Sequence, residues 1–257
     1  MAHSDGTATK QRRVRILPDP DPSHPRTEYD NVGLLACWHK RYKLGDVQPA
    51  GSSEAWLSGL ATEACPRLRD LLEYWEQDGE DWLIDQCGHT IPAAEEAALQ
   101  HRRALITHVL QQWYVILPVY MYDHSGLVLQ TAPFSDPWDS GQVGYIACSL
   151  SKARETYMLP TADWDTRLTG EPLRLRERVT KTLQAEVEVY SQYLGGDVWY
   201  YVCEEYEQCE ACDRGEWQTV DSCGGFYGSD PHANGMWDAV AEEWREALLA
   251  AAGVGTS

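Results

Sequence analysis

The sequence is poor in basic side chains and has no long apolar stretch. Its 257 residues contain 21 Lys and Arg against 40 Asp and Glu, which gives a formal net charge of −19. Most of such a surface repels a nucleic acid, so we expect no direct nucleic-acid binding. No run approaches the roughly 18 uninterrupted apolar residues of a membrane-spanning helix, so we expect no membrane partner. At 43% hydrophobic residues, the composition is typical of a globular protein.

The sequence signatures of several enzyme classes are also missing. There is no Walker A loop, no G-x-G-x-x-G after an apolar run and no H-E-x-x-H. A G-x-S-x-G nucleophile elbow is absent as well. The first residues, Met1–Gly6, lack the apolar core of a secretory signal peptide, so we expect a cytoplasmic protein.

The negative charge is concentrated in two parts of the chain. Residues 51–100 carry eleven acidic and two basic side chains, and residues 201–257 carry twelve and two. In one interpretation these are solvated faces that keep the protein soluble. In the other, one or both form an anionic surface that binds a basic partner or imitates a nucleic acid.

Residues 1–30 predict a flexible arm, because several basic side chains are followed by the Pro-rich run Pro18–Pro22, which cannot sustain a helix. Residues 31–257 predict a single domain with an acidic helical insertion around 51–112. Hairpins dominate the rest, and no βαβ repeat occurs. We therefore predict an α+β fold, a mainly antiparallel sheet of about five strands with packed helices.

Hydrophobic periodicity places the individual elements. Strands are predicted over 31–37, 115–122, 127–131, 142–149, 198–206 and 217–223. Pro118 confines its strand to an edge or a bulge, and the strand beginning at Val198 reads as a central one. The longest helix is predicted over 171–194. A last helix follows Asn234, with an apolar face formed by Trp237, Val240, Trp244 and Leu248.

Two neighbouring loops contain the candidates for catalysis. Asp123, His124 and Ser125 share a predicted turn, and Asp139 and Ser140 lie on the ten-residue connection that follows the next strand. A histidine oriented by a carboxylate can transfer protons, with a serine as nucleophile or substrate contact. The predicted strand between the loops spans about 17 Å, so the connection must fold back for the two groups to meet.

Aromatic and amide side chains in the loops are candidate binding residues. They are Trp138 and Gln142 on the long connection, and Phe226 and Tyr227 in a Gly-rich segment after the last strand. The alternative interpretation of these loops is structural. Asp, Ser and Gly then form turns with their own backbone, while Phe134 and Trp138 pack the connection on the core.

Four of the eight cysteines fall in one predicted hairpin. Cys209 and Cys212 form a C-x2-C pair near its tip. Cys203 and Cys223 lie at equal distances from the hairpin midpoint near Asp213, so we expect these two side by side. Four thiolates suit a zinc ion, but about 20 Å of extended strand between Cys203 and Cys209 opposes a common site. Zinc is one hypothesis, inert free thiols in a reducing cytosol are a second, and redox chemistry is a third. No further cofactor is predicted.

Four segments carry a resemblance to a known family. They read NVGLLACWHKRYKLGD at 31–46, LPVYMYDHSG at 117–126, FSDPWDSGQVG at 134–144 and DSCGGFYG at 221–228. With these motifs the chain resembles a family of uncharacterised proteins carried by bacteriophages and mobile elements. It departs from them in the acidic helical stretch and the Cys-bearing hairpin tip. The resemblance implies no activity, but it implies a phage-borne accessory protein acting in the bacterial cytoplasm.

From these observations we predict a non-catalytic acidic binding protein. It would act on a host protein with a basic surface, in counter-defence or by imitating a nucleic acid. The alternative is a hydrolase or transferase that uses His124, Asp139 and Ser140 on a small polar substrate. The enzyme hypothesis requires these side chains to converge within hydrogen-bonding distance.

Overall fold

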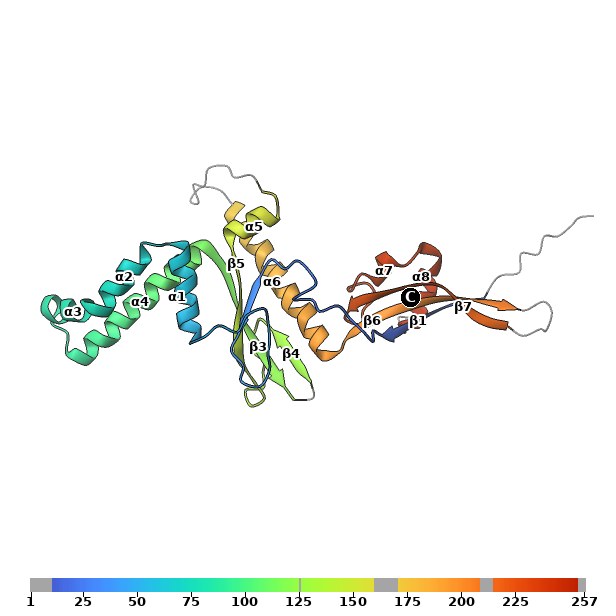
Figure 1. The fold of residues 1–257 in the computed structure, drawn as a ribbon, viewed down its shortest axis with the longest axis horizontal. Coiled ribbons are helices and arrows are strands. Elements are labelled where there is room, and N and C mark those ends of the chain that lie inside the picture. The colour runs from blue at the N-terminus through green and yellow to red at the C-terminus, as the bar shows by residue number, and fades with distance from the viewer. Residues whose placement is uncertain (1–10, 125, 160–170, 209–214, 254–257) are drawn as a thin grey trace, which may run out of the picture. The chain divides into compact units, whose positions relative to one another are not determined.

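A computed structural model describes residues 11–124, 126–159, 171–208 and 215–253 (Figure 1). The chain divides into two units. Unit 1 comprises the described residues within 1–29, 125–128 and 189–257, and unit 2 comprises those within 30–124 and 129–188. Within residues 31–257, for which the sequence predicts a single domain, the boundary between the two units falls inside the longest helix.

The elements confirm the α+β class. The strands are β1 (Arg12–Pro18), β2 (Leu34–Cys37), β3 (Tyr114–Asp123), β4 (Leu127–Gln130), β5 (Ser140–Ser149), β6 (Val198–Gln208) and β7 (Gly215–Tyr227). The helices are α1 (Ser53–Ala64), α2 (Leu68–Gln77), α3 (Gly79–Cys87), α4 (Ile91–Trp113), α5 (Leu150–Thr156), α6 (Glu171–Gly195), α7 (Met236–Ala239), the short 3-10 helix η1 (Glu242–Trp244) and α8 (Arg245–Ala251). None of the helices in the described ranges is long and apolar enough to span a bilayer.

The strands form two antiparallel sheets in place of the single sheet of about five strands that the sequence predicts. One has the order β1-β6-β7 and the other the order β2-β5-β3-β4. The central position predicted for β6 is confirmed. The extra strand is β1, which the sequence assigns to the flexible arm.

Strand β1 corrects the prediction of an arm for residues 12–18. It pairs with β6 from Arg12 opposite Glu205 to Pro18 opposite Trp199. The physical reason is the alternation of its side chains, because Val14 is buried in the core of unit 1 while the flanking arginines reach carboxylates on β6. Residues 1–10 lie outside the described part of the chain.

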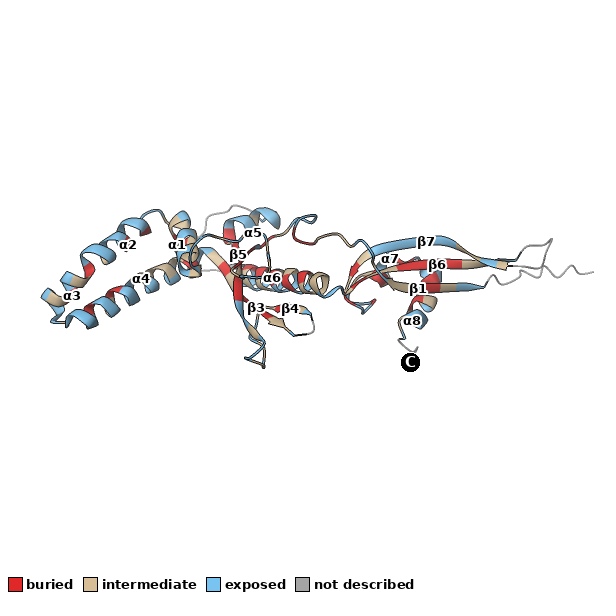
Figure 2. Ribbon diagram, turned by 60° about the horizontal axis from the view of Figure 1, so that its bottom comes forward, coloured by how far each residue is buried: buried red, intermediate tan, exposed pale blue. Residues whose placement is uncertain are grey.

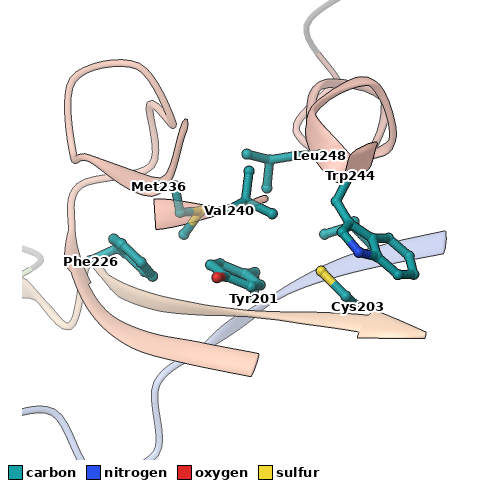
Figure 3. Packing of buried hydrophobic residues seen from close by; sticks show 8 residues of the cluster. Tyr201, Cys203, Phe226, Met236, Val240, Trp244 and Leu248 are labelled. Atoms are coloured by element: carbon teal, nitrogen blue, oxygen red, sulfur yellow. The ribbon is translucent and has the colours of Figure 1, made fainter. Parts of the chain in front are cut away.

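The core of unit 1 lies between its sheet and the C-terminal helices (Figure 3). Tyr201 and Cys203 of β6 face three buried side chains from the helical segment, Val240, Trp244 and Leu248. The sequence predicts this face correctly but places it on one continuous helix. The helix is broken, because Val240 has extended backbone with ψ 138° between α7 and η1.

In unit 2, α6 packs on the four-stranded sheet. Its predicted apolar face is buried through Leu175, Val179, Leu183 and Val187. Gly33 lies beneath this face, where a Cβ atom would overlap the side chain of Leu183 and stand 2.7 Å from Ile146 Cγ1. Glycine therefore allows the helix to approach the sheet closely.

Pro118 lies on β3, which is an inner strand of this sheet and not an edge. The register of β3 with β5 shifts between Val119 and Tyr120, directly after the proline. A bulge accommodates a residue that cannot donate a backbone hydrogen bond. Pro118 itself stands opposite Tyr145 in regular register, and the residue without a partner is Val143 of β5, so Pro118 lies beside the bulge and not in it.

Helices α1 to α4 occupy the stretch for which the sequence predicts acidic helices. Two apolar clusters hold them together, one around Leu68, Leu72 and Leu110 and the other around Leu83 and Ala98. Large apolar side chains of these helices are open to solvent: Leu71 is 48% exposed, Leu99 37% and Trp113 50%. Figure 2 shows that exposed residues predominate on α2 to α4.

Candidate functional site

The end of β3 and the start of β5 bring the predicted catalytic residues Asp123, His124 and Asp139 together. Tyr122 of β3 stands opposite Ser140 of β5 in the antiparallel register. The connection from β4 folds back along that short strand, and Asp139, at its end, reaches the end of β3. The length of β4 therefore does not keep the two loops apart.

His124 and Asp139 form a hydrogen-bonded dyad. His124 Nδ1 lies 3.0 Å from Asp139 Oδ2, and the Asp123 backbone N–H donates to the Asp139 carbonyl at 3.0 Å. Both side chains are largely open to water, at 65% for His124 and 43% for Asp139. A carboxylate on Nδ1 orients the ring and leaves Nε2 as the nitrogen available to a ligand.

Tyr42 and Arg41 complete this group, which we term the dyad cluster (Arg41, Tyr42, Asp123, His124 and Asp139). The Tyr42 hydroxyl donates to Asp123 Oδ2 at 3.0 Å, and an Arg41 guanidinium nitrogen lies 3.7 Å from the same oxygen. Desolvation and the hydrogen bond to Asp123 raise the pKa of the Tyr42 phenol. The carboxylate of Asp123 is therefore held by Tyr42 and Arg41, while Asp139 orients His124.

Sequence reasoning did not select Arg41 or Tyr42 as site residues. The signal that could have indicated them is the segment 31–46, one of the four that carry the resemblance to the phage family. Hydrophobic periodicity cannot find such residues, because they reach the site from a loop that is distant from it in the sequence.

Ser140, the predicted nucleophile, does not contact His124. Its hydroxyl donates to the carbonyl oxygen of Asp136. Ser125 lies outside the described residues. Among the described residues, His124 is hydrogen-bonded to the Asp139 carboxylate and to no hydroxyl group. No nucleophile–base pair therefore forms there.

Trp138 is 91% exposed, although the structural interpretation of the loop expects it to pack on the core. Phe134 is partly buried, with its ring 5.6 Å from the ring of Tyr122. The Trp138 backbone N–H donates to Asp136 Oδ1 at 2.9 Å, which forms a local turn. Gln142 donates to the carbonyl of Gly144 on its own strand at 3.3 Å.

The other two predicted binding residues, Phe226 and Tyr227, belong to unit 1. Phe226 is 7% exposed, and its ring stacks on Tyr201 within the core (Figure 3). The Tyr227 hydroxyl donates to the carbonyl of Ser23 at 2.5 Å, and burial raises the pKa of this phenol. Both side chains thus have packing roles.

The expectation that Cys203 and Cys223 lie side by side is wrong. Cys203 stands opposite Asp221, and Cys223 stands opposite Tyr201, because register shifts interrupt the pairing of β6 with β7. Cys203 is fully buried, and burial raises the pKa of its thiol to about 11, whereas Cys223 is exposed.

The zinc hypothesis requires Cys209 and Cys212, which lie outside the described residues. The part of the chain that the structure does describe contains no group of three or more potential metal ligands. A zinc ion held by all four cysteines would also require the buried Cys203 to lose its proton and leave the apolar core. Zinc at this hairpin remains a prediction.

The acidic segment, defined as residues 53–113, carries mostly unpaired carboxylates. Only two of its eleven acidic side chains form ion pairs there, Glu54 with Arg103 at 2.8 Å and Glu76 with Arg102 at 3.3 Å. Large apolar side chains are exposed among the charges. They are Leu71, Tyr74, Trp82, Ile91, Leu99 and Trp113.

The second acidic block is partly neutralised by β1. Glu204 binds Arg13 at 2.6 Å and Arg15 at 2.9 Å, and Glu205 binds Arg12 at 2.9 Å. The hydrogen bonds from Arg13 and Arg15 lower the pKa of the Glu204 carboxyl. Each acidic block therefore has two ion-paired carboxylates among the described residues, Glu54 and Glu76 in the first and Glu204 and Glu205 in the second.

Comparisons with known proteins do not show a family. No family model matches the chain, and no solved structure matches it. Residues of the chain are 31% identical to UDP-N-acetylenolpyruvoylglucosamine reductase of Burkholderia vietnamiensis over 98 positions, which cover 34% of this chain and 27% of that protein. So partial a match carries neither a fold nor an activity to this protein.

Proposed function

We propose that this protein is a phage-borne accessory protein of the bacterial cytoplasm that binds, without catalysis, a basic surface on a host protein. The observation that carries the proposal is the acidic segment. Nine of its eleven carboxylates have no basic partner among the described residues, and exposed apolar side chains lie between them.

An unpaired anionic surface has a specific consequence for binding. Carboxylates that are not compensated within the chain attract a basic surface over roughly a Debye length, about 8 Å at physiological ionic strength. This attraction raises the association rate with a basic partner, and repulsion by the same carboxylates disfavours acidic partners. Charge alone gives little affinity, however, so a stable complex also needs apolar anchors.

The aromatic residues of α2 and α3 supply such anchors. The ring of Tyr74 lies 5.6 Å from that of Trp75, which lies 6.3 Å from Trp82. Trp75 is fixed from the other side by His101, whose ring stacks on it at 4.4 Å. Tyr74 and Trp82 are 39% and 46% exposed. Rigid aromatic side chains rimmed by charge are typical of the energetic centre of an interface.

The alternative, a hydrolase or transferase, has weaker support. It rests on the hydrogen bond between His124 and Asp139, whereas the hydroxyl of Ser140 is used by Asp136. The binding function requires only carboxylates and exposed apolar side chains, which the described residues supply, and we therefore prefer it.

The proposal is tested by capturing host proteins from a lysate on the immobilised full chain. The acidic segment is altered by Glu73→Gln, Asp85→Asn and Glu95→Gln together. The control removes the same charge elsewhere in unit 2 through Glu155→Gln, Glu177→Gln and Glu188→Gln. We expect one host protein to be recovered at 50 mM NaCl, lost at 500 mM, and reduced at least about fivefold by the first triple variant only.

Three results would contradict the proposal. They are the absence of any specifically captured protein, capture that 500 mM NaCl does not weaken, and equal losses for the two triple variants. Circular dichroism of each variant confirms that the helices are retained.

A further inference from the structure

Aromatic and acidic side chains alternate on the exposed surface of α2 and α3. Tyr74, Asp78 and Trp82 are four positions apart, and Asp85 follows three positions later; all four are exposed. The Asp78 backbone N–H donates to the Tyr74 carbonyl at 2.8 Å, and that of Trp82 donates to the Asp78 carbonyl at 3.0 Å. The helical repeat thus continues through the junction, and neighbours in this ring–carboxylate row (Tyr74, Asp78, Trp82 and Asp85) stand about 5–6 Å apart at their Cβ atoms.

Trp75 supports the two exposed rings of this row. Its ring meets those of Tyr74 and Trp82 nearly at right angles, with interplanar angles of 76° and 83°. Trp75 itself is packed against Gly79, where a Cβ atom would overlap its ring, and it stacks on His101. Tyr74 and Trp82 therefore stand on a packed support, although 39% and 46% of their surfaces are open to water.

The carboxylates of the row are not neutralised within the described chain. Neither Asp78 nor Asp85 has a side-chain hydrogen bond or ion pair with another described residue. Residues 70–85 carry seven acidic side chains and no basic one. No arginine or lysine of the described ranges lies over the ring of Tyr74 or Trp82 either. Both the rings and the charges thus face solvent.

Elsewhere in the chain, the same pair of groups holds an arginine. The Arg13 guanidinium carbon lies 4.1 Å from the centroid of the Trp217 ring, and Arg13 also binds Glu204 at 2.6 Å. Two further sets share this arrangement, Arg12 with Trp244 and Glu205, and Arg41 with Tyr42 and Asp123. An exposed ring beside a carboxylate is therefore an arginine-binding unit that this protein uses internally.

We propose that the ring–carboxylate row binds arginine side chains on the surface of the host protein. Each guanidinium stacks on Tyr74 or Trp82 and pairs with the carboxylate of Asp78 or Asp85. The inference rests on the proposed host-protein binding and names the chemical group that this binding recognises. Charge complementarity selects a cation, and the exposed rings select which cation.

Arginine and lysine differ in how they use such a row. The guanidinium group is planar and weakly hydrated, so it can stack on an aromatic ring while it donates two parallel hydrogen bonds to a carboxylate. The lysine ammonium is a compact, strongly hydrated charge that gains little from the ring. The row should therefore distinguish two basic surfaces of equal charge by their arginine content.

The test is calorimetric titration of the full chain with two peptides at 50 mM NaCl. Both are alanine-based, about 16 residues long and equally charged, one with four arginines and the other with four lysines at the same positions. We expect the arginine peptide to bind at least about fivefold more tightly, because only its side chains gain from the rings.

Variants separate the ring from the charge. Trp82→Leu weakens the arginine peptide about threefold or more and leaves the lysine peptide unchanged, whereas Trp82→Phe, which keeps an aromatic face, retains the preference. Asp78→Asn weakens both peptides. The matched controls are Trp113→Leu, at an exposed tryptophan with no carboxylate within four positions, and Glu177→Gln on α6. Both controls leave the preference intact, and circular dichroism confirms that each variant retains its helices.

Three results overturn the inference. They are equal affinities of the two peptides or no binding of the arginine peptide, an arginine preference that survives Trp82→Leu, and a control variant that loses the preference as well. The proposed function fails in a different way. If salt-sensitive capture of a host protein is observed while the two peptides bind equally, only the assignment to arginine is wrong. If the arginine peptide is preferred but no host protein is captured, only the proposed function is wrong.

Discussion

At the scale of single residues, Glu204 is the most constrained carboxylate that the structure describes. It is 4% exposed, although the strand becomes exposed to solvent three residues later, at Glu207. Hydrogen bonds from Arg13 at 2.6 Å and Arg15 at 2.9 Å hold it. A buried carboxylate is tolerated only when charged donors satisfy it, so these arginines fix β1 to β6.

We expect Glu204→Gln to lower the free energy of unfolding by roughly 2 kcal/mol at pH 7, because it removes charge-assisted hydrogen bonds. The arginines lower the pKa of Glu204 from its ordinary value near 4.5. Its contribution is therefore complete above about pH 4.5 and disappears as pH falls through the lower pKa of the folded protein. The difference between wild type and variant should shrink in acid.

Urea denaturation over a series of buffers from pH 7 to pH 2.5 measures this difference. Glu207→Gln, on the exposed end of the same strand, is the control and should change stability by less than about 0.5 kcal/mol. A Glu204→Gln penalty that persists unchanged at the lowest pH would refute the ionic explanation.

Individual side chains are also where sequence reasoning fails most often. Residues such as Trp138 and Leu71 have apolar surfaces that predict burial, and both are exposed. Whether a side chain is buried depends on neighbours that a single sequence does not specify. The His124–Asp139 contact was a testable candidate because both residues lie in predicted loops. Its partners Arg41 and Tyr42 were not, since they come from a third loop.

At the scale of elements, β5 is the strand on which the larger sheet depends. It is paired on both sides, with β2 and β3. Gly144 stands opposite Cys37 of β2, and a Cβ at this position would overlap the carbonyl oxygen of Ala36. This backbone atom cannot move without breaking the pairing of β2 with β5.

We expect Gly144→Ala to destabilise the protein by about 2–3 kcal/mol, the usual range for an added group in a packed site. Gly141→Ala is the matched control on the same strand, because a Cβ there meets nothing within 4 Å. Thermal denaturation of both variants checks the prediction. Equal melting temperatures for the two would show that β2 is not closely packed on β5.

Elements with a clear period were predictable, and those fixed by distant contacts were not. The strands of both hairpins and the buried face of α6 follow from local patterns. Strand β1 was missed, because three of its seven residues are arginines and their partners lie on β6. The break at Val240 was missed as well, because the buried residues on either side of it keep the spacing of a single helical face.

At the scale of the whole molecule, the net charge of −19 opposes folding. A compact chain brings like charges closer together, and dissolved salt screens their repulsion. Added salt also weakens the exposed Arg–Glu ion pairs, but each such pair stabilises the protein by only about 1 kcal/mol or less. Net repulsion should therefore dominate the salt dependence of stability.

We expect the melting temperature to rise by a few degrees between 20 mM and 500 mM NaCl. The variant with Glu73→Gln, Asp85→Asn and Glu95→Gln should show a smaller rise, because it carries three fewer negative charges. Circular dichroism at increasing temperature measures both. A melting temperature that falls with added salt would mean that ion pairs outweigh the repulsion.

The pairing of β1 with β6 also sets the order in which unit 1 can be built during translation. Arg13 and Glu204 are 191 positions apart. At elongation rates of about 5–20 residues per second, the strand emerges from the ribosome roughly 10–40 s before its partner. Throughout that interval the nascent chain carries a basic strand without its partner, and the arginines and Val14 of β1 are available to chaperones.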